Sequence, residues 1–191
     1  MKKHIYLMVI NALGIAMFFV IGKFVAIPTP IPNFALFLQF AILLVFGFYY
    51  GPIVGFTIGF FGHLLIDLTS GYGLWMSWIV CSGLFGLIIG LSSMLVNRLG
   101  NPYKPVKMII FCSLVTVGGV VCWILIAPTG DILFYQEPYD VVFLEGVVAF
   151  ASNVVTALII GLPIIYGLKR ARVPYTYINK GERISNEEIN Q

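Results

Sequence analysis

Residues 51–78 read GPIVGFTIGFFGHLLIDLTSGYGLWMSW, and this stretch decides the fold of the chain. A Gly-Pro start opens an apolar segment, a Gly-rich turn interrupts it, and a second apolar segment follows. Small and then ionisable residues recur at every fourth position of the first segment: Gly51, Gly55, Gly59, His63 and Asp67. A four-residue step advances about 40° around a helix, so these residues form one slowly drifting stripe.

The two halves of this stripe predict different roles. Small residues let another helix approach closely. An ionisable side chain in an apolar helix normally faces a partner or a cavity. His63 and Asp67 can therefore bond each other and join two helices, or they can face a ligand, and the sequence leaves both interpretations open.

The composition indicates a membrane protein. Hydrophobic residues make up 60% of the 191-residue chain, charged residues make up 10%, and the mean hydropathy is +0.99. A soluble domain has about 25% charged residues. The net charge of +3 is too small to indicate nucleic-acid binding, and the three cysteines lie in apolar segments without a disulfide or metal framework. We therefore predict an all-α polytopic membrane protein that needs no metal and no cofactor.

The apolar segments predict six transmembrane helices, because about 20 apolar residues cross a bilayer core. The predicted spans are residues 5–27, 34–49, 52–68, 74–96, 105–127 and 141–168. A proline-rich loop ends the first span, and Pro128-Thr129-Gly130-Asp131 is expected to end the fifth. The chain then divides into a transmembrane substrate-binding domain at 1–168 and a polar cytoplasmic tail at 169–191.

The basic residues predict the orientation. With the N-terminus inside, all but one of the lysines and arginines fall on the inner side: Lys2, Lys3, Arg98, Lys104, Lys107, Lys169, Arg170, Arg172, Lys180 and Arg183. Only Lys23 falls on the outer side. Cytoplasmic loops carry an excess of Lys and Arg, so both termini are expected in the cytoplasm.

Polar and aromatic residues gather in the outer half of these spans. The candidate substrate-binding residues are Asn33, Gln39, His63, Asp67, Trp75, Trp78, Ser82, Trp123, Glu145 and Asn153, with Ser152 and Thr156 beside them. A flat heteroaromatic ligand could stack on tryptophan and bond the amides and carboxylates, as in most small-molecule sites. Structural alternatives remain: the tryptophans can form an interfacial belt, Glu145 can extend to water, and the hydroxyls can bond their own helix.

Catalytic motifs are absent from the sequence. There is no phosphate-binding loop, no H-E-x-x-H zinc motif and no Gly-x-Ser-x-Gly turn. The chain is therefore not expected to hydrolyse ATP itself. A small membrane enzyme is disfavoured on the same grounds.

The chain resembles the S components of energy-coupling factor (ECF) transporters, the subunits that bind vitamins in bacteria. Ala12-Leu-Gly-Ile-Ala16 resembles the Ala-x-x-x-Ala motif through which S components dock on the transmembrane T component. The block from Gly51 to Gly90, with its glycines, His63, Asp67 and tryptophans, resembles the riboflavin-type branch, which includes proteins assigned to hydroxymethylpyrimidine or pyridoxine. The resemblance covers the first four spans well and the last two weakly.

The resemblance implies a multi-pass protein of the bacterial plasma membrane, with a T component and two ATPase subunits as partners. It implies that the loop after the first span covers the pocket, and that the ligand is a hydroxymethylpyrimidine or pyridoxine-like heteroaromatic. Riboflavin remains the alternative ligand. A self-sufficient secondary carrier is the rival class, but inverted repeats and broken midplane helices are not seen. Ala12 and Ala16 could instead pack inside the bundle.

Overall fold

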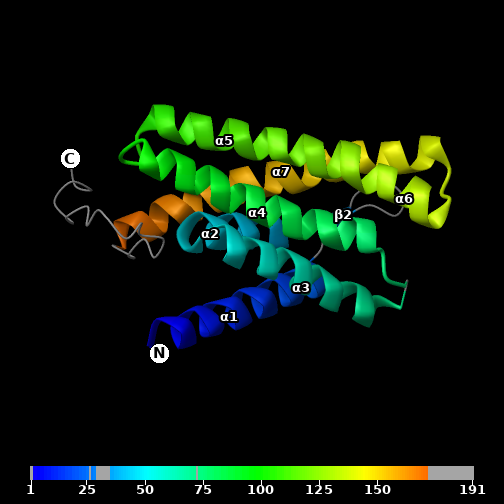
Figure 1. Ribbon diagram of the computed structural model, residues 1–191, viewed down its shortest axis with the longest axis horizontal. Coiled ribbons are helices and arrows are strands. Elements are labelled where there is room, and N and C mark those ends of the chain that lie inside the picture. Colours follow the sequence, from blue (N-terminus) through cyan, green and yellow to red (C-terminus); the bar gives the residue numbers. More distant parts are fainter. Residues whose placement is uncertain (1, 26, 29–34, 72, 172–191) are drawn as a thin grey trace.

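The computed structural model describes residues 2–25, 27–28, 35–71 and 73–171, and these are almost entirely helical (Figure 1). The helices are α1 (Lys2–Phe24), α2 (Gln39–Tyr50), α3 (Pro52–Ser70), α4 (Met76–Arg98), α5 (Pro105–Gly119), the π-helix η1 (Val120–Ile126), α6 (Ala127–Tyr135) and α7 (Tyr139–Arg170). Two short strands, β1 (Ile27–Pro28) and β2 (Ala35–Leu36), pair antiparallel between α1 and α2. Asn33 and the tail at 172–191 lie outside the described residues.

Five helical segments are long and apolar enough to cross a membrane: α1, α3, α4, the continuous run from α5 to α6, and α7. This confirms the predicted all-α polytopic fold. The second predicted span, residues 34–49, is shorter than expected, because α2 has only 12 residues and is about 18 Å long. The bilayer core is about 30 Å thick, so α2 cannot cross it alone. Its predicted start at residue 34 was wrong, since residues 35–36 are extended and pair with β1.

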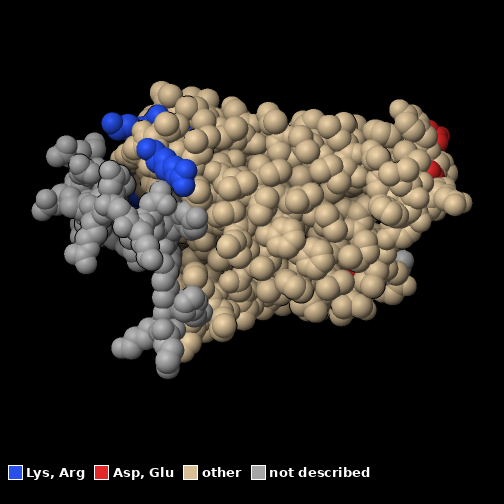
Figure 2. All heavy atoms as spheres, in the orientation of Figure 1, with Lys and Arg blue, Asp and Glu red and all other residues tan. Residues whose placement is uncertain are grey.

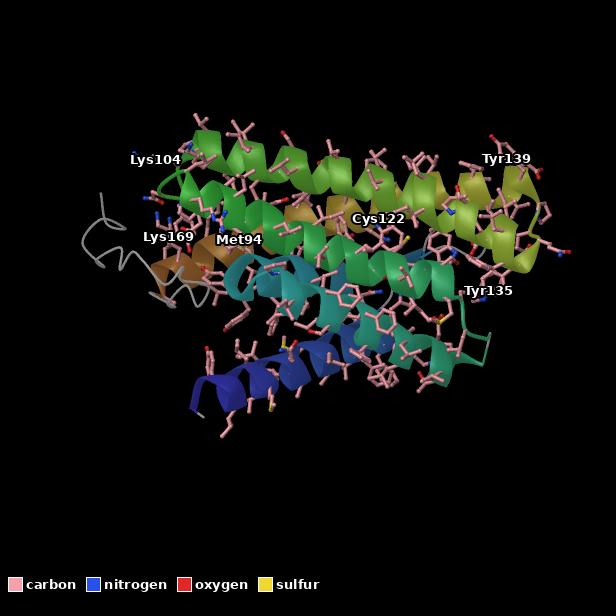
Figure 3. All side chains as sticks on the ribbon, in the orientation of Figure 1. Met94, Lys104, Cys122, Tyr135, Tyr139 and Lys169 are labelled. Atoms are coloured by element: carbon pink, nitrogen blue, oxygen red, sulfur yellow. The ribbon has the colours of Figure 1, made fainter. Side chains whose placement is uncertain are left out.

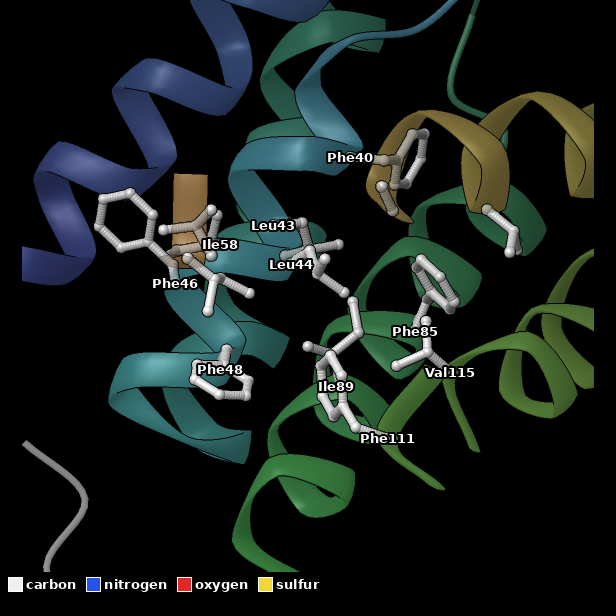
Figure 4. Close-up of a cluster of buried hydrophobic side chains, with 14 of the residues drawn as sticks. Phe40, Leu43, Leu44, Phe46, Phe48, Ile58, Phe85, Ile89, Phe111 and Val115 are labelled. Carbon is white, nitrogen blue, oxygen red and sulfur yellow. The ribbon is translucent and has the colours of Figure 1, made fainter. Parts of the chain in front are cut away.

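The short helix α2 lies inside the bundle. Ten of its 12 residues are buried, and it packs against α1, α3, α4 and α7. A helix that is apolar all round is expected in such a position. Its phenylalanines and leucines form the core together with aromatic residues of α4 and α5, including Phe85 and Phe111 (Figure 4).

Helices α3 and α4 touch through their backbones. A Cβ atom built on Gly55 would lie 2.8 Å from the carbonyl carbon of Gly86, and one on Gly59 would lie 2.7 Å from that of Ser82. Side chains at these positions would hold the two helices apart. The glycine half of the stripe is therefore a packing surface, as its spacing predicted.

The fifth span continues past its predicted stop at Pro128. The helix runs on through α6 to Tyr135, so residues 128–131 are helical and not part of an outer loop. The prediction was wrong because Pro128 lies at the start of α6, where a proline's missing N–H costs little. The π-helix η1 directly precedes it, and its Cys122 carbonyl accepts a bond from the Cys81 thiol at 3.1 Å.

Charged residues separate along the long axis of the bundle (Figure 2). We call one end the basic end, where Arg98, Lys104, Lys107, Lys169 and Arg170 lie, and the other the acidic end, where Glu137, Asp140 and Glu145 lie. Figure 3 shows Lys104 and Lys169 at one end and Tyr135 and Tyr139 at the other. Helix α1 begins and α7 ends at the basic end (Figure 1). The positive-inside rule predicts that this end faces the cytoplasm.

Cysteine labelling tests this orientation. We expect Glu137→Cys to react with an impermeant maleimide in intact cells and Lys104→Cys to react only after lysis, in a chain whose native cysteines are replaced. Both positions are at helix ends or in connecting turns, so the reagent has access to them. Labelling of position 104 in intact cells, without labelling of position 137, would show the opposite orientation.

Candidate functional site

Two tryptophans form the centre of the candidate site. The ring of Trp123 in η1 stacks on Trp78 in α4, with centroids 5.8 Å apart and an angle of 24°. Phe40, near the start of α2, meets Trp123 edge-on at 5.4 Å. Trp123 is 0% exposed, so the belt interpretation is wrong for this residue. Three helical elements therefore contribute to one aromatic cluster.

Asp131 holds Trp78 in place. The Trp78 Nε1–H donates to Asp131 Oδ2 at 2.6 Å, and the Ser77 hydroxyl donates to Asp131 Oδ1. Asp131 is 1% exposed, and a buried carboxylate needs such partners. The sequence reasoning missed this residue because it ended the helix at Pro128. If the predicted helix had continued past Pro128, Asp131 would have been placed eight residues after Trp123, on a helix face near that of Trp123.

Four buried polar atoms on α2, η1 and α7 lack a hydrogen-bond partner within the described residues. They are Gln39 Oε1, Trp123 Nε1, Ser152 Oγ and Asn153 Oδ1. Helix α7 packs against both α2 and η1, so these atoms come from neighbouring elements. Buried polar groups are almost always paired, and an unpaired one costs about 1–3 kcal/mol. Each such group calls for an explanation, and a polar ligand that binds in the bundle would supply one.

His63 and Asp67 bond each other and α4. His63 Nδ1 and Ser82 Oγ share a hydrogen bond of 2.5 Å, and His63 Nε2 lies 3.5 Å from Asp67 Oδ1. The Trp75 backbone N–H donates to Asp67 Oδ2 at 3.1 Å. These contacts join α3 to the first turns of α4. They support the interpretation in which the ionisable half of the stripe connects two helices.

The remaining predicted residues lie in different places. The Trp75 ring packs on Tyr135, 4.8 Å away at the acidic end. Glu145 is exposed on α7, whereas Gln39, Asn153 and Thr156 are buried. The structure therefore brings Trp78 and Trp123 together, places the Gln39 amide beside Gly22 of α1, and places Glu145 on the surface.

Ala12 and Ala16 lie on the exposed side of α1. The opposite side of α1 packs on the bundle, where a Cβ atom on Gly14 would lie 2.8 Å from Ile58 Cγ1. Phe18 is 0% exposed on that same side. The alternative in which the two alanines pack inside the bundle is therefore wrong.

Comparisons with known proteins give the same family throughout. A sequence model described as the S component of ECF-type riboflavin transporters matches residues 2–170. The UPF0397 protein of Streptococcus gordonii is 40% identical over 164 residues, which cover 86% of this chain and 88% of that protein. The UPF0397 protein of Streptococcus pneumoniae strain CGSP14 is 39% identical over 149 residues, which cover 78% of this chain and 81% of that protein.

Proposed function

The chain belongs to the family of S components of ECF-type riboflavin transporters, and from that premise we propose that it binds a small heteroaromatic vitamin beside Trp123. Membership of the family makes it a vitamin-binding transport subunit and a multi-pass protein of the bacterial plasma membrane. The proposed ligand is a hydroxymethylpyrimidine or a pyridoxine-like ring. Uptake is driven by ATP hydrolysis in two ATPase subunits, which a T component connects to this chain.

The stacked tryptophan pair and the unpaired buried polar atoms of α2, η1 and α7 support this proposal. The amide oxygens of Gln39 and Asn153 accept hydrogen bonds, Trp123 Nε1 donates one, and the Ser152 hydroxyl does either. An aminopyrimidine or hydroxypyridine offers N–H or O–H donors together with a ring-nitrogen acceptor. One such ring can satisfy both kinds of protein atom while stacking on an indole.

The close packing of the cluster favours a single ring. Phe40, Trp78 and Trp123 are already in ring contact, so a larger ligand must displace more of them. The three-ring system of riboflavin would need the greater displacement. Riboflavin is nevertheless the second candidate, because the matched family is described by that vitamin.

A ligand panel distinguishes these candidates. The full chain, purified in detergent, is heated with hydroxymethylpyrimidine, pyridoxine or riboflavin, and binding is then measured by calorimetry. A ligand at 100 times its Kd stabilises the folded state by about 2.7 kcal/mol. We expect a single-ring vitamin to raise the melting temperature. A rise with riboflavin alone would contradict the size argument.

Substitution of a residue whose buried polar atom is unpaired should change ligand affinity without lowering the stability of the free protein. We expect Asn153→Leu to weaken binding of the identified vitamin about tenfold to hundredfold, because the ligand donor then lacks a buried partner. The melting temperature of the free protein should stay equal or rise, because Leu has no buried polar atom to satisfy. Calorimetry and thermal unfolding of the same sample measure both effects.

Two serines provide a matched control for this test. Ser152 Oγ is buried without a partner, whereas Ser93 Oγ donates to the Phe48 carbonyl at 2.7 Å. Ser152→Ala should weaken binding about fivefold with little change in stability. Ser93→Ala should instead lower the melting temperature and leave affinity unchanged. Equal affinities in Ser152→Ala, Asn153→Leu and the unmodified chain would place the ligand elsewhere.

A further inference from the structure

A groove of about 670 Å³ lies between α5 and α7 in the half of the bundle nearest the basic end. One side of α5, from Pro105 to Val117, forms one wall, and Leu162 and Tyr166 of α7 form the other. The lining is mostly apolar. Its volume falls in the range of about 300–1,000 Å³ that is typical of sites for small molecules.

The groove faces away from the exposed alanines of α1. Helix α1 packs on α2 and α3, whereas α5 packs on α4, η1 and α7. Figure 1 shows α1 and α5 on opposite sides of the bundle. A partner protein docked on α1 therefore leaves this groove open to the bilayer.

Two lysines lie near one end of the groove. Lys104 directly precedes Pro105, and the Lys169 ammonium lies 4.8 Å from the ring centroid of Tyr103. The Tyr103 ring in turn lies 6.3 Å from the ring of Tyr166, which lines the groove. Lys169 is thus positioned by a cation–π contact beside the groove.

Tyr103 is itself held firmly. Its hydroxyl is bonded to that of Tyr49 at 3.2 Å, and the Tyr49 hydroxyl donates to the Ile165 carbonyl at 3.1 Å. Tyr49 is 1% exposed and Tyr103 is 9% exposed. The aromatic platform under Lys169 therefore belongs to the packed core and connects α2 to α7.

These cations have no carboxylate partner in the described part of the chain. The one ion pair found there joins His63 to Asp67, and the described carboxylates all lie in the acidic half. The positive charges at the groove are consequently available to an anion from outside the bundle.

We propose that this groove binds an anionic phospholipid, with an acyl chain along α5 and α7 and the phosphate near Lys104 and Lys169. The apolar lining of the groove is suited to the acyl chain of the lipid, and the two lysine ammonium groups are suited to its phosphate headgroup. Basic pockets between transmembrane helices favour anionic lipids, with about 1 kcal/mol for each Lys or Arg near the surface. This site is separate from the vitamin site at the tryptophan pair and does not depend on it.

Cys112 provides a native reporter for this site. It lines the groove and is half-buried, whereas Cys81 and Cys122 are both 0% exposed. The rate of its modification by N-ethylmaleimide is measured on the full chain in detergent, with added dioleoyl phosphatidylglycerol or dioleoyl phosphatidylcholine. We expect phosphatidylglycerol to protect Cys112 at a concentration at least tenfold lower than phosphatidylcholine.

Charge variants show whether the effect is local. Lys104→Gln and Lys169→Gln should each raise the protective concentration of phosphatidylglycerol about fivefold. Arg98→Gln is the matched control, because Arg98 ends α4 at the same end of the bundle, whereas Lys104 adjoins the groove residue Pro105 and Lys169 lies over Tyr103. It should leave the protective concentration unchanged.

A groove-filling variant provides an independent measurement. Ser113 is exposed within the groove, so a tryptophan in Ser113→Trp would fill the space proposed for the acyl chain of the lipid. The substitution leaves every charge of the protein unchanged. Phosphatidylglycerol should raise the melting temperature of the unmodified chain and not that of this variant. Equal protection by the two lipids, equal effects in Arg98→Gln and Lys169→Gln, or a thermal shift that persists in Ser113→Trp would each overturn the proposal.

Discussion

Gly86→Ala is expected to lower the melting temperature of the detergent-solubilised protein by about 10 °C. The added Cβ would lie 2.5 Å from the carbonyl carbon of Gly55, which is a backbone atom and cannot rotate away. Helices α3 and α4 must then separate, and α3 makes its most extensive packing with α4. Overpacking costs about 1–3 kcal/mol and sometimes more, and about 2–4 °C is lost per kcal/mol in a chain of this size.

Gly167→Ala is the matched control, because a Cβ on that residue of α7 meets nothing within 4 Å. Alanine is the better helix former by about 1 kcal/mol, so this variant should melt at the same temperature or slightly higher. Thermal unfolding of the two variants side by side measures the difference. Equal melting temperatures would mean that α3 and α4 are not in backbone contact.

Ala12→Leu and Ala16→Leu are expected to abolish vitamin uptake in cells while leaving ligand binding by the isolated chain intact. Both positions are exposed on α1, so the added bulk does not disturb the bundle. It would instead separate α1 from the T component, whose proposed docking needs close approach of two helices. Uptake of labelled vitamin measures transport, calorimetry measures ligand binding, and co-purification with the T component measures docking.

Ala151→Leu provides the control for added bulk, since Ala151 is exposed on α7. This variant should transport normally, because the substitution is the same and the helix is different. Loss of binding in Ala12→Leu, with co-purification retained, would show that α1 serves the pocket rather than the docking of a partner.

The sequence was sufficient for the features that depend on local spacing and composition. The glycines at every fourth position predicted the close contact of α3 and α4, which Gly55 and Gly86 form. Trp78 and Trp123, which were both singled out from the sequence, stack on each other in the structure. The glycine spacing within α3 was enough to predict a close approach, although the partner helix is known only from the structure.

The sequence was insufficient where neighbouring elements decide the outcome. Pro128 was expected to end a helix, but the preceding π-helix and the packing around it keep the chain helical as far as Tyr135. Glu145 was expected in the pocket because it is one of the polar residues in the outer halves of the predicted spans. In the structure Gly146 packs against Pro128, since a Cβ atom built on Gly146 would lie 2.8 Å from Pro128 Cγ. Glu145 lies about 100° from Gly146 around the helix axis and faces outward.

The tyrosine and phenylalanine packing at the basic end determines where a bound molecule can go. Between Trp123 and that end the bundle is filled by Phe48, Phe111 and Tyr49, each at most 1% exposed. A vitamin at the proposed site therefore cannot pass toward the basic end through this packed core. Passage to the other side requires the subunit to be moved or its core to be rearranged, and the work for either must come from outside the chain. ATP hydrolysis by the proposed partner subunits would supply that work.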